Sequence, residues 1–377
     1  MLLPVWFSWK TAAAVLITLL ILAIPAALLA AWLGLYNIAA SRGHPAWMNW
    51  FLELGMRRSI EVHAKPQPHP DLDDPALISL GAAHYQGGCF PCHAGPGAPL
   101  NPVFLGMLPS PPRLETQAPT WKTEELHWIV EHGLQYAGMP GWSGNTRKDE
   151  VWAVVAFLRR LPALDPQGYR QLASGNSVVP EGPIDEIVAQ GVPFLKRTAC
   201  DRCHDTADRP PVSNLVPRLG SQSREYLYRS LSEYHADIRQ SGIMEPVASA
   251  LDQAGMRELA NYYAGLQSPP HATSSASPGM IERGRLLAQA GGAEGALPAC
   301  NACHAPPARG SFPQLAGQPA AYIRAQLHLF QRGGRKGSAY AVVMTEIASR
   351  LDPQQIEDAA AYFQSLPPRS PAHGAPP

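Results

Sequence analysis

The longest apolar run of the chain lies near its amino terminus. No charged residue stands between Lys10 and Arg42, and residues 11–36 read TAAAVLITLLILAIPAALLAAWLGLY. About 20 consecutive apolar residues are enough to cross a bilayer core, whereas the apolar part of a cleaved signal peptide usually has about 7–15 residues. The pattern therefore predicts an uncleaved transmembrane signal anchor over residues 11–36, with Trp32 and Tyr36 at one membrane interface.

The segment that follows, residues 37–70, is expected to lie close to the membrane. It carries Trp47, Trp50, Phe51 and Leu54 at helical spacing. Such a helix could lie in the bilayer interface, pack against the rest of the chain, or dock on a partner subunit. Apolar periodicity alone does not separate these alternatives.

Beyond residue 70, apolar positions recur with the period of a helix, and no alternating pattern typical of strands competes. Asp352 and Pro353 form a helix start signal. The expected fold is therefore all-α. The clearest predicted helices cover residues 75–85, 149–161, 225–234, 320–330 and 353–366.

Stretches rich in proline, glycine and serine divide these helices into groups. Residues from about 165 to 180 and from 267 to 279 predict linkers, and the tail at 369–377 is expected to be disordered. The 30 basic residues are balanced by 30 acidic ones. There is thus no basic excess of the kind that marks nucleic-acid-binding proteins.

All six cysteines of the chain lie in boxes of the form Cys-x-x-Cys-His, a pattern typical of covalent c-type haem attachment. On a helix, residues three and four apart lie on the same face. Two thiols can then reach the vinyl groups of one porphyrin, and the histidine lies under its iron. Three covalently bound haem c groups are predicted, held by Cys89 and Cys92 with His93, Cys200 and Cys203 with His204, and Cys300 and Cys303 with His304.

Other uses of paired cysteines fit this sequence less well. A zinc site would need two further ligands for each box, and no cysteine is left over. A thioredoxin-like redox pair is expected once, in a βαβ context, and not three times with histidine attached. On the haem interpretation no thiol remains free for a disulfide.

The boxes belong to an internal repeat. Met244 lies 40 residues after His204, Met344 lies 40 after His304, and the corresponding Met139 follows the first box at 46. The second and third copies agree further, because RLGSQ at 218–222 matches QLAGQ at 314–318. Fixed offsets of this kind identify repeated structural units. We call these units the first, second and third repeats.

The order of haem box, downstream methionine and terminal aromatic helix resembles class I cytochrome c. The second and third repeats resemble the tandem dihaem periplasmic cytochromes, and the first resembles a more divergent monohaem domain. The architecture as a whole is similar to membrane-anchored trihaem cytochrome c subunits of bacterial periplasmic dehydrogenases. The resemblance covers roughly residues 71–368 and implies three class I cytochrome c domains at 71–165, 181–267 and 279–368. They are expected after an N-terminal transmembrane helix at 11–36 and a membrane-proximal segment at 37–70, and before a tail at 369–377.

The same resemblance implies the distal iron ligands, namely Met139, Met244 and Met344. A thioether sulfur favours reduced iron and raises its potential. Met256 has no counterpart in the third repeat, and Met107 lies only 14 residues after His93, so neither is chosen.

Some other residues are candidates for weaker roles. The basic cluster of Arg332, Arg335 and Lys336 is expected to form a solvated loop. Five histidines are expected at the surface or on the propionate side of a haem: His84, His127, His132, His235 and His328.

With both axial positions filled, such haems transfer electrons without binding substrate. No catalytic residue is predicted, and it is uncertain whether the chain belongs to an enzyme. We expect an electron-transfer subunit that delivers electrons from a periplasmic dehydrogenase to quinone or a terminal oxidase. The alternatives are a free-standing anchored shuttle between a quinol-oxidising complex and a terminal oxidase, and a haem peroxidase with an open distal site.

The expected location is the bacterial cytoplasmic membrane, with one crossing and the haem domains in the periplasm. Arg42, Arg57 and Arg58 follow the span, so the positive-inside rule opposes this orientation. We give more weight to haem attachment, which takes place outside the bacterial cytoplasm.

Overall fold

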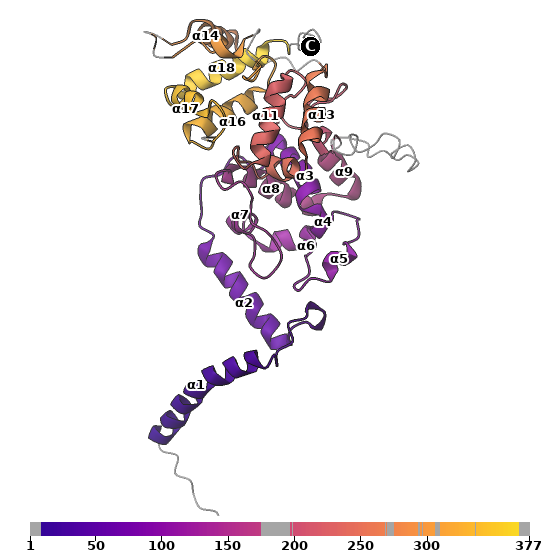
Figure 1. Ribbon diagram of the computed structural model, residues 1–377, viewed down its shortest axis with the longest axis vertical. Helices are drawn as coiled ribbons and strands as arrows, with labels where there is room; N and C mark the ends of the chain where they lie inside the picture. The colour runs from indigo at the N-terminus through magenta and orange to yellow at the C-terminus, as the bar shows by residue number, and fades with distance from the viewer. Residues whose placement is uncertain are drawn as a thin grey trace, which may run out of the picture.

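The computed structural model describes residues 9–174, 197, 199–267, 269, 275–292, 295, 297–305, 310–335 and 337–368. These residues form helices, turns and loops, with one isolated β-bridge between Leu134 and Met139. The predicted tail at 369–377, the start of the predicted second domain and the linker residues 175–180 lie outside the described residues. Two helices lead from the amino terminus to a helical body (Figure 1).

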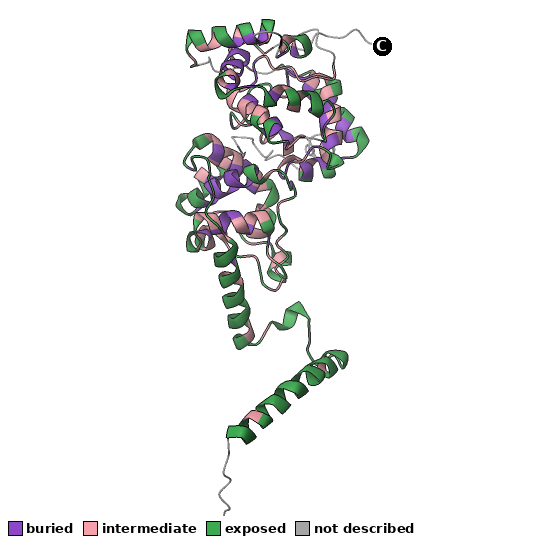
Figure 2. Ribbon diagram, turned by 90° about the vertical axis from the view of Figure 1, so that its left-hand side faces the viewer, coloured by how far each residue is buried: buried purple, intermediate pink, exposed green. Residues whose placement is uncertain are grey.

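The first helix, α1 (Trp9–Trp32), is exposed along almost its whole length (Figure 2). An 18-residue window within it has a mean hydropathy of 2.7, and it is the one helix in the described part of the chain that is long and apolar enough to cross a membrane. A signal sequence near an amino terminus meets the same criteria.

The second helix, α2 (Ala46–His63), connects α1 to the body. Its carboxyl-terminal half packs on the first repeat, because Ile60 is buried and the Arg57 guanidinium lies 4.7 Å from the ring centre of Trp121. In its amino-terminal half, Trp50 and Phe51 are exposed. The sequence left open whether this helix lies in the membrane interface, packs against the rest of the chain or docks on a partner. Packing against the rest of the chain holds for its carboxyl-terminal half.

In the first repeat, the helix that enters the haem box crosses the helix that follows the methionine. These are α3 (Pro75–Gly88) and α8 (Lys148–Arg160). Gly81 makes the crossing possible, because a Cβ at this position would lie 1.9 Å from the carbonyl oxygen of Ala153. The other elements here are α4 (Phe90–His93), α5 (Pro102–Leu105), α6 (Leu114–Gln117), η2 (Ala118–Thr120), α7 (Thr123–His132), η3 (Leu161–Ala163) and α9 (Pro166–Ser174).

The expectation of a linker from about 165 to 180 is wrong for its first half. Residues 166–174 form α9, which packs against α3. Tyr169 is 4% exposed and donates a hydrogen bond of 2.6 Å to Gln86 Oε1. Burial of Tyr169 and Ala173 thus fixes a segment whose glycine and serine content is typical of a linker.

The second and third repeats follow the same helical plan. The second contains α11 (Arg224–His235), α12 (Met244–Ser249) and α13 (Gln253–Ala264), while most of the segment before its haem box lies outside the described residues. In the third, a Cβ at Gly284 would lie 2.0 Å from the Asp358 carbonyl oxygen, so two helices cross closely again. The helices of the third repeat are α14 (Pro278–Ala290), α15 (Asn301–His304), α16 (Ala320–Gln331), α17 (Ala341–Ser349) and α18 (Pro353–Ser365).

The second and third repeats meet through the two matched pentapeptides. The Gln318 side chain accepts from Arg218 N at 3.0 Å and donates to Arg218 O at 2.9 Å. The Gln222 side chain makes the same pair of bonds to Gln314, at 3.0 and 2.8 Å. Repeated sequence thus produces a reciprocal contact, in which each glutamine binds the first residue of the other pentapeptide.

Candidate haem-binding sites

Each haem box forms one helical turn. The backbone N–H of the histidine donates to the backbone carbonyl of the first cysteine, at 3.0 Å in the first box, 2.9 Å in the second and 3.0 Å in the third. This turn brings both sulfurs and the imidazole to one side of the backbone, as attachment to one porphyrin requires. Burial, followed by the neighbouring thiol of Cys92, raises the pKa of Cys89 to about 12.

The three box histidines share the same second contact. His93 Nδ1 lies 2.8 Å from Pro112 O, His204 Nδ1 lies 2.9 Å from Pro217 O, and His304 Nδ1 lies 2.8 Å from Pro313 O. A carbonyl can only accept, so Nδ1 carries the proton and Nε2 keeps a free lone pair. Burial lowers the pKa of each imidazole and favours its neutral form. This tautomer and charge suit an iron ligand.

One cavity of about 650 Å³ joins the second and third boxes. It is lined by His204 and Met244 of the second repeat and by His304 and Met344 of the third. The cysteines that face it are Cys200, Cys203, Cys300 and Cys303. The cysteines, histidines and methionines predicted from sequence in these two repeats thus line one shared cavity.

Met256, the rejected rival in the second repeat, has a different position. It is 2% exposed and belongs to the apolar core around Leu259. Its sulfur accepts a hydrogen bond from Ser232 Oγ at 3.7 Å. It is not among the residues that line the cavity, which is consistent with a packing role.

Two arginines at equivalent repeat positions, Arg239 and Arg335, line the same cavity beside Tyr226 and Tyr322. Arg239 is 5% exposed and donates to Ser230 Oγ at 3.2 Å. Burial lowers the pKa of Arg335, and the positive charge of Arg239 lowers it further. Two like charges in one low-dielectric space favour anions there. The two propionate groups of a haem provide such anions, so the residues present fit the cofactor.

The position of Arg335 corrects the expectation of a solvated basic loop. Arg332 is exposed, as expected, and Lys336 lies outside the described residues. Arg335 turns inward, donates to Gln326 Oε1 at 2.8 Å and lies 4.6 Å from the ring centre of Phe330. The signal that was missed is its constant offset from Arg239, which equals that between Tyr226 and Tyr322.

The first box has its own surroundings. Met139 forms the isolated bridge with Leu134, whose N–H donates to Met139 O at 3.1 Å. The methyl group of Met107 lies against Gly138, where an added Cβ would be 2.2 Å from it. The structure therefore brings both methionines to the same loop region, although Met107 was rejected on spacing.

The five additional histidines divide into two groups. His132, His235 and His328 are exposed, which fits the expectation of surface residues. His127 is 1% exposed, with its ring centre 4.0 Å from that of Trp152. His84 lines the large cavity and contacts Trp142, the ring centres lying 4.9 Å apart. For His127 the surface assignment is wrong, because the helix that carries it is packed on α8.

Comparison with known proteins agrees with this geometry. The family model of cbb3-type cytochrome c oxidase subunit III matches residues 76–158, and the cytochrome c model matches residues 281–367. Cytochrome c-552 of Acidithiobacillus ferridurans is 34% identical over 180 residues, which are 46% of this chain and 76% of the relative. The chain belongs to the c-type cytochromes. Covalently bound haem c is therefore its cofactor.

Two further relatives of this c-type cytochrome are informative. The thiosulfate dehydrogenase electron acceptor of Stutzerimonas stutzeri is 31% identical over 184 residues, covering 48% of this chain and 85% of the relative. A solved structure of cytochrome c4 from Acidithiobacillus ferrooxidans is 35% identical, covers 44% of this chain and 98% of its own, and has a TM-score of 0.40. The sequence similarity to cytochrome c-552 and to this electron acceptor supports a role in electron transfer.

Proposed function

We propose that this chain is a membrane-anchored trihaem cytochrome c that relays electrons in the bacterial periplasm. The main support is the contact found in all three boxes, where the histidine Nδ1 is bonded to a proline carbonyl and Nε2 is left free for iron. Each repeat is then a class I cytochrome c domain with one haem.

In this proposal, Met139, Met244 and Met344 are the ligands opposite the three histidines. A bound haem supplies an iron that alternates between the ferric and ferrous states. The protein holds it through two sulfurs, fixes the tautomer of the histidine and keeps water away. With both axial positions filled, the site passes electrons and does not bind substrate.

Haem content tests the proposal directly. A pyridine haemochrome assay on the purified full-length chain should give three haems per polypeptide. Replacing both cysteines of the second box, Cys200→Ala with Cys203→Ala, should remove one of the three. A content of two in the unmodified chain would contradict the trihaem assignment, and an unchanged content in the variant would exclude the second box.

Membrane attachment is proposed for α1, with support from α2. The amino-terminal half of α2 exposes Trp47, Trp50, Phe51 and Leu54 at positions i, i+3, i+4 and i+7. This apolar stripe follows closely after a helix that could span the bilayer, and it suits the interfacial region of the same membrane. The chain should stay in the membrane pellet after alkaline washing, whereas a Leu20→Arg and Ile21→Arg double variant should be released or degraded.

The proposed electron donor is a periplasmic dehydrogenase, and quinone or a terminal oxidase is the acceptor. One relative is named as the electron acceptor of thiosulfate dehydrogenase, which supports this type of donor. Mild detergent extraction of the tagged chain should therefore yield a dehydrogenase subunit that reduces its haems. Extraction of the chain alone would count against a stable complex.

A second candidate is an anchored shuttle that delivers electrons to a terminal oxidase. It is favoured by the match between residues 76–158 and the subunit III family of cbb3-type oxidase. In that case an oxidase should be recovered with the chain, and the reduced chain should be oxidised by membranes that contain this oxidase. The peroxidase alternative requires an open distal site and would appear as a high-spin ferric spectrum.

A further inference from the structure

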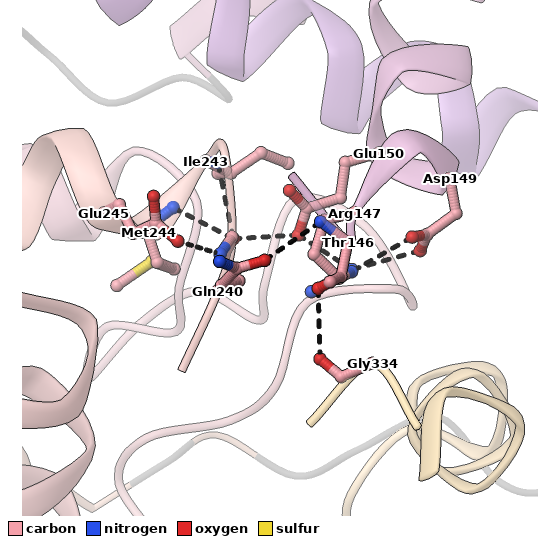
Figure 3. Close-up of polar contacts among 10 residues, drawn as sticks. Thr146, Arg147, Asp149, Glu150, Gln240, Ile243, Met244, Glu245 and Gly334 are labelled. Carbon is pink, nitrogen blue, oxygen red and sulfur yellow. Dashed lines mark hydrogen bonds and ion pairs between the residues drawn. The ribbon is translucent and has the colours of Figure 1, made fainter. Parts of the chain in front are cut away.

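The first repeat binds the loop that carries the methionine of the second repeat. Figure 3 shows this junction, in which Thr146 N donates to Gln240 Oε1 at 2.9 Å. The next residue along the loop, Ser241, donates from Oγ to Glu150 Oε1 at 2.8 Å. Glu150 lies in α8 of the first repeat. Two successive residues before Met244 are thus held by a different repeat.

Ser241 is the centre of the hydrogen bonds within this loop. Its hydroxyl oxygen accepts from Ile243 N at 3.3 Å and from Met244 N at 3.1 Å, and its own N–H donates to Glu245 Oε1 at 2.6 Å. The backbone of Met244 is therefore connected to Glu150 through one buried hydroxyl group. Since that hydroxyl donates to a carboxylate, it becomes a better acceptor for the Met244 N–H.

Glu150 itself is tightly constrained. It is 8% exposed and forms an ion pair with Arg147, whose Nη2 lies 2.7 Å from Glu150 Oε1. Burial raises the pKa of Glu150, while Arg147 and the Ser241 hydroxyl oppose that rise. Arg147 also binds Asp149 at 3.0 Å (Figure 3). Burying a carboxylate is costly unless it is paired, and both the Arg147 ion pair and the Ser241 bond reach the same oxygen, Oε1.

A parallel contact joins the second and third repeats. Glu233 Oε1 of α11 accepts from Ala339 N at 2.9 Å, in the loop just before Met344. In both cases a largely buried glutamate of the preceding repeat contacts the loop ahead of the next methionine. The two contacts are not equivalent by repeat position, because Glu150 lies in the helix after the methionine of its repeat and Glu233 in the helix before it.

We propose that Glu150, acting through Ser241, is a positioning residue for Met244, so that docking of the first repeat determines the sulfur ligation of the second haem. This proposal rests on the proposed function, in which Met244 is an iron ligand. A loop released from Glu150 holds the thioether less firmly, and the iron–sulfur bond weakens. The second haem then responds to whether the first repeat is correctly docked.

The test uses the full-length holoprotein and two readouts: the methionine-to-iron charge-transfer band of the ferric state, and carbon monoxide binding by the ferrous state. Glu150→Ala and Ser241→Ala should each lose about one third of the band, because one haem of three is affected. Each should also gain one carbon monoxide site, with the same spectrum as the site created by Met244→Ala. A shift in the midpoint potential of this one haem should accompany the change.

Conservative variants separate positioning from general damage. Glu150→Gln and Ser241→Thr keep an acceptor and a hydroxyl, so both should retain the full band. Asp149→Ala is the matched control, because Asp149 shares Arg147 but does not contact Ser241. If Glu150→Ala or Ser241→Ala folds with three haems and an unchanged band, the proposal is wrong. If the unmodified chain lacks three haems, or Met244→Ala leaves the spectrum unchanged, the proposed function fails instead.

Discussion

At the scale of single residues, a carbonyl oxygen fixes the tautomer of the histidine in each box. Pro112, Pro217 and Pro313 each place their carbonyl 2.8–2.9 Å from a histidine Nδ1. Proline has no N–H of its own and fixes its φ angle, so the direction of its carbonyl depends on ψ and on the packing of the loop that carries it. The proposed sulfur ligand is less tightly determined in the first repeat, where Met107 and Met139 lie in the same loop region.

A pair of variants should identify the distal ligand of the first haem. We expect Met139→Ala to open this haem to carbon monoxide in the ferrous state, because one axial position loses its sulfur. Met107→Ala, in which the neighbouring methionine is removed, should leave carbon monoxide binding as it was. The reverse result in the same optical titration would assign the ligand to Met107.

His127 should make the stability of the first repeat depend on pH. Burial lowers its pKa from the ordinary value of 6.5, so the folded protein keeps it neutral while the unfolded chain takes up a proton. The stability that it contributes is complete above pH 6.5 and is lost as the pH falls from there through the lowered value in the folded state.

The check is to follow urea unfolding above and below pH 6.5 in a His127→Phe variant, which keeps an aromatic ring next to Trp152. The loss of stability on acidification should be smaller in this variant than in the parent. Replacing the exposed His328, which lies in the third repeat, by Phe should leave the pH dependence as it was. An equal loss in the parent and in His127→Phe would show that His127 is not the responsible group.

At the scale of the elements, the first repeat and the third repeat each contain a close helix crossing at a glycine. Gly81 faces the Ala153 carbonyl and Gly284 faces the Asp358 carbonyl, with no room for a side chain in either case. At these contacts backbone lies against backbone, so the neighbouring atom cannot rotate away. The crossing brings the entry helix of the haem box against the helix that follows the methionine.

Replacing either glycine by alanine should therefore destabilise its repeat, by about 1–3 kcal/mol for a forced overpacking. Gly279→Ala provides a control in α14, the same helix as Gly284, since its added Cβ would meet nothing closer than 3.7 Å. Denaturant unfolding followed by the haem absorbance should show a lower midpoint for Gly284→Ala than for Gly279→Ala. Equal midpoints would mean that the crossing can relax.

At the scale of the whole molecule, the repeats are connected by side chains that bind a neighbouring repeat. Gln222 and Gln318 bind backbone and join the second and third repeats, and Glu150 accepts from the Ser241 hydroxyl and joins the first and second. The two glutamine contacts are reciprocal because the pentapeptides that carry them are repeated. They turn a row of units into a body in which one repeat constrains the next.

Removing Gln318 should weaken the junction of the second and third repeats. Gln318→Ala leaves the buried N–H and carbonyl of Arg218 without their partner, at a cost of about 1–3 kcal/mol for each unsatisfied group. Unfolding of the two repeats, followed by calorimetry, should then become less cooperative. The exposed Gln253→Ala should retain the cooperativity of the parent, and an identical trace for both variants would contradict the prediction.

Local patterns were sufficient for much of this architecture. The helices at 75–85, 225–234 and 353–366 follow from apolar periodicity, and the capping box at Asp352 confirms the predicted helix start. The inward turn of Arg335 and the helix at Tyr169 did not follow, because each depends on a partner far away in sequence. Glu150 was missed for the same reason, since its role depends on Ser241 in another repeat.

The second and third boxes open into one cavity instead of two. If each box held a haem, both would border this shared cavity, so a change of charge at one would be felt at the other. The pair would then be reduced in two macroscopic steps that belong to neither centre alone. Taking up a first electron would make the second harder to accept, and the two steps would be spread over a wider range of potential.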